Sequence, residues 1–506
     1  MIAQVHTATL MGLDALPVVA EVDLTGGDPV MVLVGLPDKA VTESCHRVRS
    51  AVINSDLTWP KRKIVCNLAP GDLRKEGPTL DLPIAIAVLA ALETVPVSEL
   101  RDTVFLGELG LDGALRPVDG ALNVAMMAVE RGFRRFILPA ASALEAAVIP
   151  DLEVYGVERL IDVVELLNGS LAHSPIDITQ ARTAALTERF EVDFADVKGQ
   201  RHAVRALEIA AAGGHNLLMV GPPGSGKTML ARRMPTIMPP LSLAESVAVT
   251  RVISAAGQRG GREGLVAERP FRSPHHTSSY AAIVGGGKTP KPGEISLAHL
   301  GVLFMDEMPE FDRSVLEALR QPLEDGEITV ARVQASLTFP AQCVLIGAMN
   351  PCPCGYRGYP EAQCVGNPAT CDRYAQRISG PLLDRIDLHV TVPRLKPDEL
   401  LGMQTGEPSA LIRARVISAR ARQDARLGQS RVNAKMTPRE LHQHVPLDDD
   451  AQSFMRQVSS RLNISARVFD RLIKVGRTIA DLAESENLTR KHLAEAVQFR
   501  STVVEN

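Results

Sequence analysis

The stretch NLLMVGPPGSGKTML, which runs from Asn216 to Leu230, constrains the fold more than any other part of the chain. Four apolar residues predict a short buried strand, and a glycine-rich turn leads from it into a helix. Glycines allow backbone amides to point inward around phosphate oxygens, and the helix N-terminus adds partial positive charge. Lys227 would lie beside the β- and γ-phosphates, and the Thr228 hydroxyl would ligate Mg²⁺. The predicted nucleotide site comprises Gly221, Pro222, Pro223, Gly224, Ser225, Gly226, Lys227 and Thr228.

Two further predicted strands end in polar residues. GVLFMDE ends in Asp306 and Glu307, at the carboxyl end of a buried strand, where ligands of open α/β sheets bind. Asp306 would hold Mg²⁺ through water, and Glu307 would orient and polarise the attacking water, which predicts a hydrolase rather than a kinase. AQCVLIGAMN ends in Asn350, which either positions that water or caps the next turn. Its matching position on a third strand favours the first role.

Two arginines are candidates for stabilising charge on the phosphates. Arg385 lies between two aspartates in GPLLDRIDLHV, and an arginine at a subunit edge can reach the γ-phosphate of the neighbouring subunit as a finger. Arg467 lies on a predicted C-terminal helix that could close over the same phosphates. Taken alone, either arginine is more often part of a surface ion pair of little energetic weight.

These residues stand in a longer series of motifs, namely FADVKGQ, GPPGSGKT, FRSPHHTSS, PKPGEISLAHLGVLFMDE, LEDGEITVARV, LTFPAQCVLIGAMNPCPCG and SGPLLDRIDLHV. With them the chain resembles the AAA+ ATPases of the magnesium-chelatase-like group, and within it the YifB/ComM family, over nearly its whole length. The resemblance implies ATP and Mg²⁺ as ligands and a homo-hexameric ring with ATP sites between subunits. The roles that it implies are Walker A for Lys227 and Thr228, Walker B for Asp306 and Glu307, sensor 1 for Asn350, arginine finger for Arg385, sensor 2 for Arg467, and nucleotide contacts for Val197 and Gly199 of FADVKGQ.

At 506 residues the chain is too long for one hydrophobic core. The predicted fold class is α/β, with an AAA+ P-loop core, an N-terminal domain like that of Lon proteases and a C-terminal helical domain. The predicted boundaries are 1–168 for the Lon/ChlI-like domain, 169–193 for a polar linker, 194–395 for the AAA+ domain and 396–506 for the magnesium-chelatase-like helical domain.

The first domain resembles Lon without its catalytic pair. KEGPTLDLPIAIAVLAAL matches the Lon loop that presents the nucleophilic serine, and here that position is Thr79, followed by Leu80 and Asp81 instead of small residues. The resemblance places Val124 where Lon has its lysine. Because a hydroxyl nucleophile without its base is not activated, we expect a non-proteolytic module for assembly or DNA contact.

Charge and hydropathy point to a cytoplasmic protein. A formal net charge of −4 excludes a global basic field, so any nucleic-acid surface must be local. The N-terminus does not read as a signal peptide, and the longest apolar run, from Leu82, is too short to cross a bilayer, so we expect no membrane contact. Seven cysteines, an odd number without a secretion signal, argue against a disulfide framework.

Four of the seven cysteines lie within the 21 residues that follow Asn350. Four thiolates can close a structural zinc site, and this glycine-containing segment has little hydrophobic content to fold around. The tight spacing of the first pair leaves reduced thiols or a redox pair as alternatives. The candidate ligands are Cys352, Cys354, Cys364 and Cys371.

Several segments could contact DNA. A loop with Tyr280 and Lys288 and a predicted hairpin with Arg332 could line a pore, or pack between subunits instead. The stretch 411–440 holds eight basic residues and two acidic ones, and could follow DNA or form a solvated helix. Trp59 in WPKRK could stack on a base. The adjacent histidines of SPHHTSS are read as hydrogen-bonding loop residues rather than metal ligands.

Three functions compete. The first is an ATP-driven hexameric helicase that promotes branch migration of recombination intermediates during natural transformation, with branched or single-stranded DNA and recombination proteins as partners. The second is a chelatase-type ATPase that remodels protein partners. The third, an ATP-dependent protease, is disfavoured by the missing Lon pair. The sequence does not distinguish the first two through their ATP sites, which share every residue.

Overall fold

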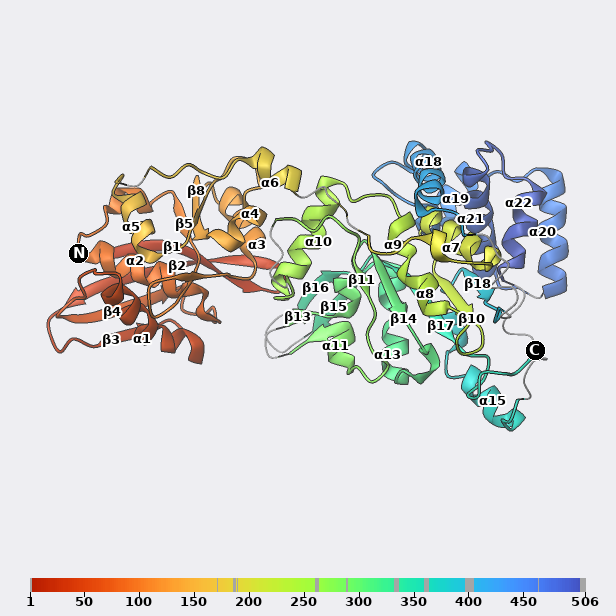
Figure 1. Cartoon of the computed structure of the whole chain (residues 1–506), viewed down its shortest axis with the longest axis horizontal. Helices are drawn as coiled ribbons and strands as arrows, with labels where there is room; N and C mark the ends of the chain where they lie inside the picture. The colour runs from red at the N-terminus through yellow and green to blue at the C-terminus, as the bar shows by residue number, and fades with distance from the viewer. Residues whose placement is uncertain are drawn as a thin grey trace. The chain divides into compact units, whose positions relative to one another are not determined.

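Figure 1 shows the computed structural model of the chain. It describes residues 2–170, 172–184, 188, 190–259, 264–287, 290–331, 336–358, 364–395, 405–462 and 464–500. The chain forms two compact units, the first comprising Met1–Thr187, Ser242–Ala267 and Lys288–Lys291, and the second comprising Glu188–Leu241, Glu268–Gly287 and Pro292–Asn506. No helix in the described ranges is both long and apolar enough to span a bilayer.

The first unit is built on a seven-stranded mixed sheet with the order β3-β4-β2-β1-β5-β8-β9. β1 pairs antiparallel with β2 and parallel with β5, and β5, β8 and β9 continue in parallel. The β-branched runs at 18–27, 30–37, 63–70 and 103–113 predict strands, and strands are present in all four, whereas β1 was not predicted. The bounds are Ala3–Met11 (β1), Asp14–Thr25 (β2), Met31–Val34 (β3), Lys63–Ala69 (β4), Thr103–Phe105 (β5), Arg135–Pro139 (β8) and Glu153–Val157 (β9).

Helices cover both faces of this sheet. Successive strand residues point to opposite faces, and accordingly Phe136 and Leu138 join one core cluster while Ile137 joins the other. α10, which belongs to the segment Ser242–Ala267 of this unit, packs against α3. The helices are α1 (Lys39–Asn54), α2 (Asp81–Ala91), α3 (Ala121–Glu130), α4 (Ala140–Ala146), α5 (Leu160–Leu167), α6 (Ile178–Ala184) and α10 (Leu243–Ala255). α6 lies inside the segment that we expected to be a polar linker.

The second unit contains a five-stranded sheet with the order β11-β14-β17-β10-β18. Every pairing in it is parallel, so the carboxyl ends of all five strands meet at one edge. The three central strands, β14, β17 and β10, are fully buried and apolar, as expected for a sheet with both faces covered, whereas the edge strand β11 is half-buried. The bounds are Leu217–Val220 (β10), Phe271–Arg272 (β11), Val302–Met305 (β14), Val344–Met349 (β17) and Leu388–Thr391 (β18). The predicted α/β fold class is confirmed.

Two other expectations for this unit are also confirmed. The segment LEDGEITVARVQASLTFP forms a hairpin in which β15 (Glu327–Ala331) pairs antiparallel with β16 (Ser336–Pro340). The C-terminal region is helical in its described parts, and its helices share one core cluster with the five-stranded sheet. They are α18 (Ser409–Leu427), α19 (Pro438–His444), α20 (Asp449–Leu462), α21 (Ala466–Leu482) and α22 (Arg490–Gln498).

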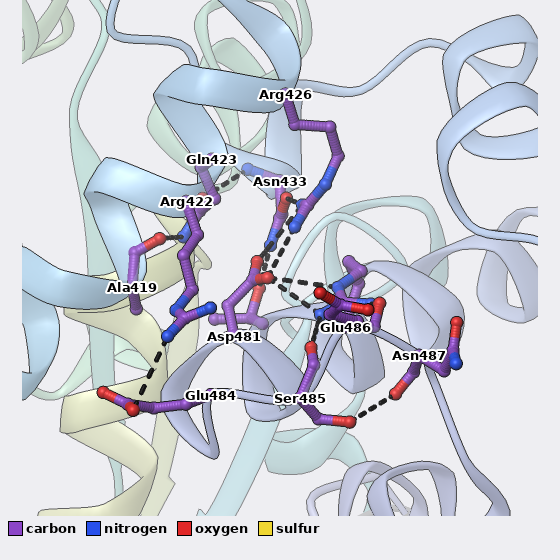
Figure 2. Close-up of polar contacts among 12 residues, drawn as sticks. Ala419, Arg422, Gln423, Arg426, Asn433, Asp481, Glu484, Ser485, Glu486 and Asn487 are labelled. Atoms are coloured by element: carbon purple, nitrogen blue, oxygen red, sulfur yellow. Dashed lines mark hydrogen bonds and ion pairs between the residues drawn. The ribbon is translucent and has the colours of Figure 1, made fainter.

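A buried carboxylate, Asp481, ties the C-terminal helices together (Figure 2). It accepts hydrogen bonds from Arg426 of α18 at 2.5 Å, from Arg477 of α21 at 2.9 Å, and from the side-chain amide of Asn433 at 2.8 Å. Arg477 also donates to two backbone carbonyls after α21, those of Ser485 and Glu486. The network fixes α21, the helix that carries Arg467, against α18.

We expect Asp481→Asn to destabilise the second unit by about 3–5 kcal/mol, because two largely buried guanidinium groups would lose their counter-charge. The matched control is Asp450→Asn, which removes an ion pair to Arg490 that is 3.3 Å long and lies at the surface. A surface pair of this kind contributes at most about 1 kcal/mol. Calorimetry of the full chain compares the two, and equal shifts in the melting transition would contradict the prediction.

Candidate nucleotide site

Lys227 opens helix α8 (Lys227–Arg232) at the end of the glycine-rich turn. Gly224 and Gly226 have φ values of 74° and 92°, which turn the backbone as a phosphate-binding loop requires. The Lys227 Nζ donates to the carbonyl oxygens of Gly221 at 2.8 Å and Pro222 at 3.0 Å. Burial lowers the pKa of Lys227, although the nearby Walker B carboxylates oppose this shift. The ammonium group is therefore held inside the loop at the point predicted for the phosphates.

The predicted magnesium ligands face each other across the sheet edge. The Thr228 hydroxyl donates to Oδ2 of Asp306 at 2.6 Å, and Oδ1 of Asp306 accepts from the backbone amide of Glu307 at 3.0 Å. A hydroxyl and a carboxylate offer the hard oxygen ligands that Mg²⁺ prefers. These residues fit the ion that the sequence predicts.

Asn350 joins the same site. Its strand, β17, lies between the strands that lead to Lys227 and Asp306, with Met349 opposite Val220 and Gly347 opposite Met305. The side-chain oxygen of Asn350 is 3.3 Å from the Lys227 Nζ. Sequence reasoning placed these residues on three strands, and the parallel sheet brings them to one edge.

Glu307 has a partner that sequence reasoning missed. Its backbone is left-handed, with a φ of 50°, and its carboxylate lies 3.4 Å from Nδ1 of His276. The ring of His276 also packs on that of His275, with centroids 4.2 Å apart. β11 pairs with β14, so residues that follow β11 arrive at the same sheet edge as Glu307. The pairing of β11 with β14 is therefore the feature from which the contact between His276 and Glu307 could have been anticipated.

Arg385 and Arg467 lie near each other, and both contact Glu324 of α14 (Arg320–Asp325). The Arg385 Nη2 donates to Oε2 of Glu324, and the Arg467 Nη2 lies 3.7 Å from Oε1. Arg385 is buried just before β18, whereas Arg467 is half-exposed in the first turn of α21. The two arginines thus share one carboxylate in the single chain.

A histidine and an asparagine before β10 connect this arginine segment to the rest of the unit. Asn216 donates to the carbonyl of Arg385 at 3.0 Å and accepts from the amide of Leu345 at 2.9 Å. His215 lies 3.0 Å from a carboxylate oxygen of Asp387. Although burial opposes it, the hydrogen bond from His215 lowers the pKa of Asp387, aided by Arg471. Sequence reasoning found no role for either residue, because nothing local marks them.

Four residues of FADVKGQ help to line a cavity of about 770 Å³ in the second unit. Val197 and Gly199 are among its walls, together with Gln200. The Gln200 side-chain amide donates to the carbonyl of Pro393 at 2.7 Å and approaches that of Ser225 at 3.4 Å. Gln200 therefore connects the cavity with the glycine-rich turn.

The four clustered cysteines bring their sulfur atoms together. Four Sγ–Sγ distances lie between 3.3 and 3.9 Å, and all four cysteines are free thiols. Four thiolates around one zinc ion, with bonds of about 2.3 Å, stand about 3.8 Å apart. A hydrogen bond from the backbone amide of Tyr356, aided by Cys352, lowers the pKa of Cys354 to about 6. Cys352, Cys364 and Cys371 lie within 4.8 Å of one another and could share a metal ion, and Cys354 adjoins them, 3.3 Å from Cys352 and 3.5 Å from Cys364.

This cysteine segment packs against the phosphate-binding loop. Gly355 has a φ of 87°, and a Cβ at this position would collide with the ring of Pro223. Another residue at Gly355 would therefore push the loop or the cysteine segment out of place. The contact joins the cysteine cluster directly to the turn that surrounds Lys227.

Most basic side chains of the stretch 411–440 already form ion pairs or hydrogen bonds within their own unit. Arg413 pairs with Glu188 at 2.6 Å, and Arg415 pairs with Glu208 at 2.5 Å. Other members contact Glu484, Asp481 and Glu440, and Arg420 and Lys435 donate to backbone carbonyls. Most of these cations therefore already have partners, which weakens the interpretation of the stretch as a DNA track.

The structure describes two of the four other residues that the sequence suggested for DNA contact. Trp59 packs against the core of the first unit, and Tyr280 is exposed at the start of α11 (Tyr280–Val284). Lys288 and Arg332 lie outside the described residues. Their predicted contacts with DNA therefore stay predictions.

The Lon-like loop of the first unit carries a buried ion pair. Asp81, two residues after Thr79, is fully buried and accepts from Arg47 Nε at 2.7 Å. Val124 is buried in the core on α3. The charged residue that departs from the Lon pattern thus anchors the loop to α1.

Three family models match the chain: "Magnesium chelatase, subunit ChlI" over 193–400, "Subunit ChlI of Mg-chelatase" over 20–142, and "Magnesium chelatase, subunit ChlI C-terminal" over 406–500. Competence protein ComM of Haemophilus influenzae is 43% identical over 99% of this chain and 98% of its own length. Protein YifB of Salmonella typhimurium is 43% identical over 99% of this chain and 97% of its own.

A shorter match concerns the first unit. Lon protease of Rhizobium meliloti is 27% identical over 25% of this chain and 16% of its own length. The full-length matches, together with the parallel sheet and the glycine-rich turn, decide the family. The chain belongs to the YifB/ComM family of magnesium chelatase-like AAA+ proteins.

Proposed function

We propose that the chain is an ATPase that works in the cytoplasm as a hexameric ring and drives branch migration of DNA recombination intermediates, in natural transformation. The observation that carries the ATPase part is the meeting of Lys227, Thr228, Asp306 and Asn350 at one sheet edge. The DNA part is supported by membership of a family that includes competence protein ComM.

In the proposed mechanism the glycine-rich turn holds the phosphates of ATP, and Val197 and Gly199 contact the nucleotide from the adjoining cavity. Mg²⁺, held by Thr228 and Asp306, would neutralise charge on the phosphates. Glu307 orients the attacking water, and Asn350 fixes its position relative to the γ-phosphate. Arg385 and Arg467 bring positive charge to the phosphoryl group as it leaves, from the edge of the neighbouring subunit in the case of Arg385.

Two segments are proposed to contact DNA, and both border one hollow of about 510 Å³. Tyr280 of α11 and Ile328 and Thr329 of β15 are among its walls. An exposed aromatic side chain can stack on a base irrespective of sequence, which suits a motor that must pass any DNA. The first unit is proposed to serve assembly or DNA contact without proteolysis, because its Lon-like loop has no lysine partner.

Strand exchange on a synthetic four-way junction tests this function. Wild type with ATP and Mg²⁺ should convert the junction into duplex products, and Lys227→Ala should not, because the charge that holds the phosphates is gone. A junction that stays intact with wild-type protein, together with ATP turnover that no DNA changes, would refute the motor. If a protein partner, rather than DNA, stimulates ATP turnover, the second candidate would be favoured, namely an ATPase that remodels proteins in the manner of a magnesium chelatase.

We further propose that Cys352, Cys354, Cys364 and Cys371 bind one structural zinc ion. The described residues between β17 and α15 (Pro368–Ala375), 350–358 and 364–367, contribute few side chains to the core, so a metal would supply cross-links that fix their path. Because Gly355 packs on Pro223, the bound metal would also support the phosphate-binding loop.

Purified protein should contain about one zinc ion per chain, and Cys364→Ser should reduce it severalfold because three thiolates hold zinc poorly. The matched control is Cys45→Ser, which changes a half-buried cysteine of the first unit. Elemental analysis by mass spectrometry measures both. Well under one zinc per wild-type chain would exclude the site.

A further inference from the structure

We propose that Glu324 is a positioning residue that holds Arg385 and Arg467 within their own subunit, and that movement of the adjoining β15–β16 hairpin releases them. The proposal rests on the proposed roles of the two arginines in ATP hydrolysis. It makes one carboxylate the link between the segment proposed to sense DNA and the groups proposed to act on ATP.

The position of Arg385 is the first observation. Its Nη1 donates to the carbonyl of Pro381 at 2.8 Å, and its Nη2 donates to Glu324. Its Nε is buried without a hydrogen-bond partner among the residues that the structure describes. The residue is only 7% exposed. A guanidinium that must reach a neighbouring subunit is therefore folded inward with its donors incompletely used, which is a position from which it has to move.

The sharing of Glu324 is the second observation. The carboxylate uses one oxygen for Arg385 and presents the other to Arg467 at 3.7 Å. The hydrogen bond from Arg385, with the charges of Arg467 and Arg471, lowers the pKa of Glu324. The carboxylate thus stays ionised at neutral pH and can hold both guanidinium groups at once. Loss of the contact would free both together.

The connection to the hairpin is the third observation. α14, which carries Glu324, ends at Asp325 and is capped by Gly326, and β15 begins at the next residue. The amide of Ala341, which follows β16, donates to the carbonyl of Gly326 at 2.8 Å, so both hairpin strands are fastened to the end of α14. Glu324 and Arg385 line the same hollow as Ile328 and Thr329. A pull on the hairpin is therefore transmitted directly to the helical turn that holds the arginines.

The first test reads the accessibility of Arg385 and needs no enzymatic activity. Full-length protein without nucleotide is treated with an arginine-selective dicarbonyl reagent, and modification of Arg385 is followed by mass spectrometry. Glu324→Gln and Glu324→Ala should raise the labelling rate about threefold or more, because the side chain opens more often once its charge partner is gone. Glu317→Gln is the matched control: Glu317 lies on the preceding helix, α13 (Arg313–Ala318), and the change removes its 2.8 Å ion pair to Arg320.

The second test reads ATP turnover with and without single-stranded DNA. Both Glu324 variants should raise the basal rate and bring the ratio of DNA-stimulated to basal turnover close to one. General structural damage would lower both rates in proportion and keep the ratio. That result, or an unchanged labelling rate of Arg385 in both variants, would overturn the proposal. Faster labelling in a protein whose wild type shows no ATP turnover would support the contact while refuting the proposed ATPase.

Discussion

Glu307→Gln is expected to bind ATP with near wild-type affinity and to hydrolyse it about 10²- to 10⁴-fold more slowly, the range for loss of a general base. The amide keeps the size and hydrogen-bonding shape of the side chain but cannot accept a proton from water. Lys227 and Thr228 are untouched, so the phosphate site stays intact. Turnover by phosphate release and affinity by fluorescent-nucleotide titration separate the two effects.

The matched control is Glu310→Gln. Glu310 lies in the 3₁₀ turn that Glu307 caps, and its carboxylate pairs with Arg377 at 2.6 Å. This variant should hydrolyse ATP at close to the wild-type rate. If Glu307→Gln instead loses ATP affinity and keeps its maximal rate, Glu307 binds substrate and another group activates water. His276, which contacts the Glu307 carboxylate, would then be the first residue to examine.

The candidate nucleotide site could be assembled from the sequence because Asp306 and Asn350 directly follow apolar runs and Lys227 follows a third one after the glycine-rich turn. A buried parallel strand leaves its polar residue at the carboxyl end, and the parallel order then places those ends side by side. Lys227, Asp306 and Asn350 could therefore be grouped from the sequence before any distance was known. The hairpin of β15 and β16 was predictable for a similar local reason, the alternation of apolar and polar residues on either side of a turn.

Side-chain partners far apart in sequence were not predictable. Glu324, His215 and Asp481 are ordinary polar residues in helices or turns, and only the packing of α14, α18 and α21 gives them their partners. In the basic stretch 411–440 the sequence suggested a partner outside the chain, whereas the partners lie within it. Its charge predicted an external partner, but the carboxylates that satisfy it come from other segments, such as Glu188 and Glu208. Periodicity shows which face is apolar and does not show which charge lies opposite.

Mixing Arg385→Ala with Lys227→Ala should restore ATP hydrolysis that neither variant has alone. An Arg385→Ala subunit keeps an intact phosphate-binding loop, and a Lys227→Ala subunit keeps an intact Arg385. In randomly mixed rings at equal amounts, about a quarter of the interfaces pair the intact loop with the intact arginine, so turnover should reach about a quarter of the wild-type rate. Phosphate release from the mixture, compared with each variant alone, measures this.

The restored rate distinguishes action across the interface from action within one chain. If Arg385 served the nucleotide of its own subunit, every site in the mixture would lack one of the two residues, and no turnover would return. The control is a mixture of Lys227→Ala with Lys227→Ala,Arg385→Ala, in which no loop is intact and the rate should stay at background. Arg385 is buried against Glu324 in the single chain, so recovery would also require that the arginine leaves this carboxylate when subunits assemble. Adding Glu324→Gln to the Lys227→Ala partner should therefore keep or raise the restored rate, and a fall to background would mean that Glu324 is needed to present Arg385 to the neighbouring site.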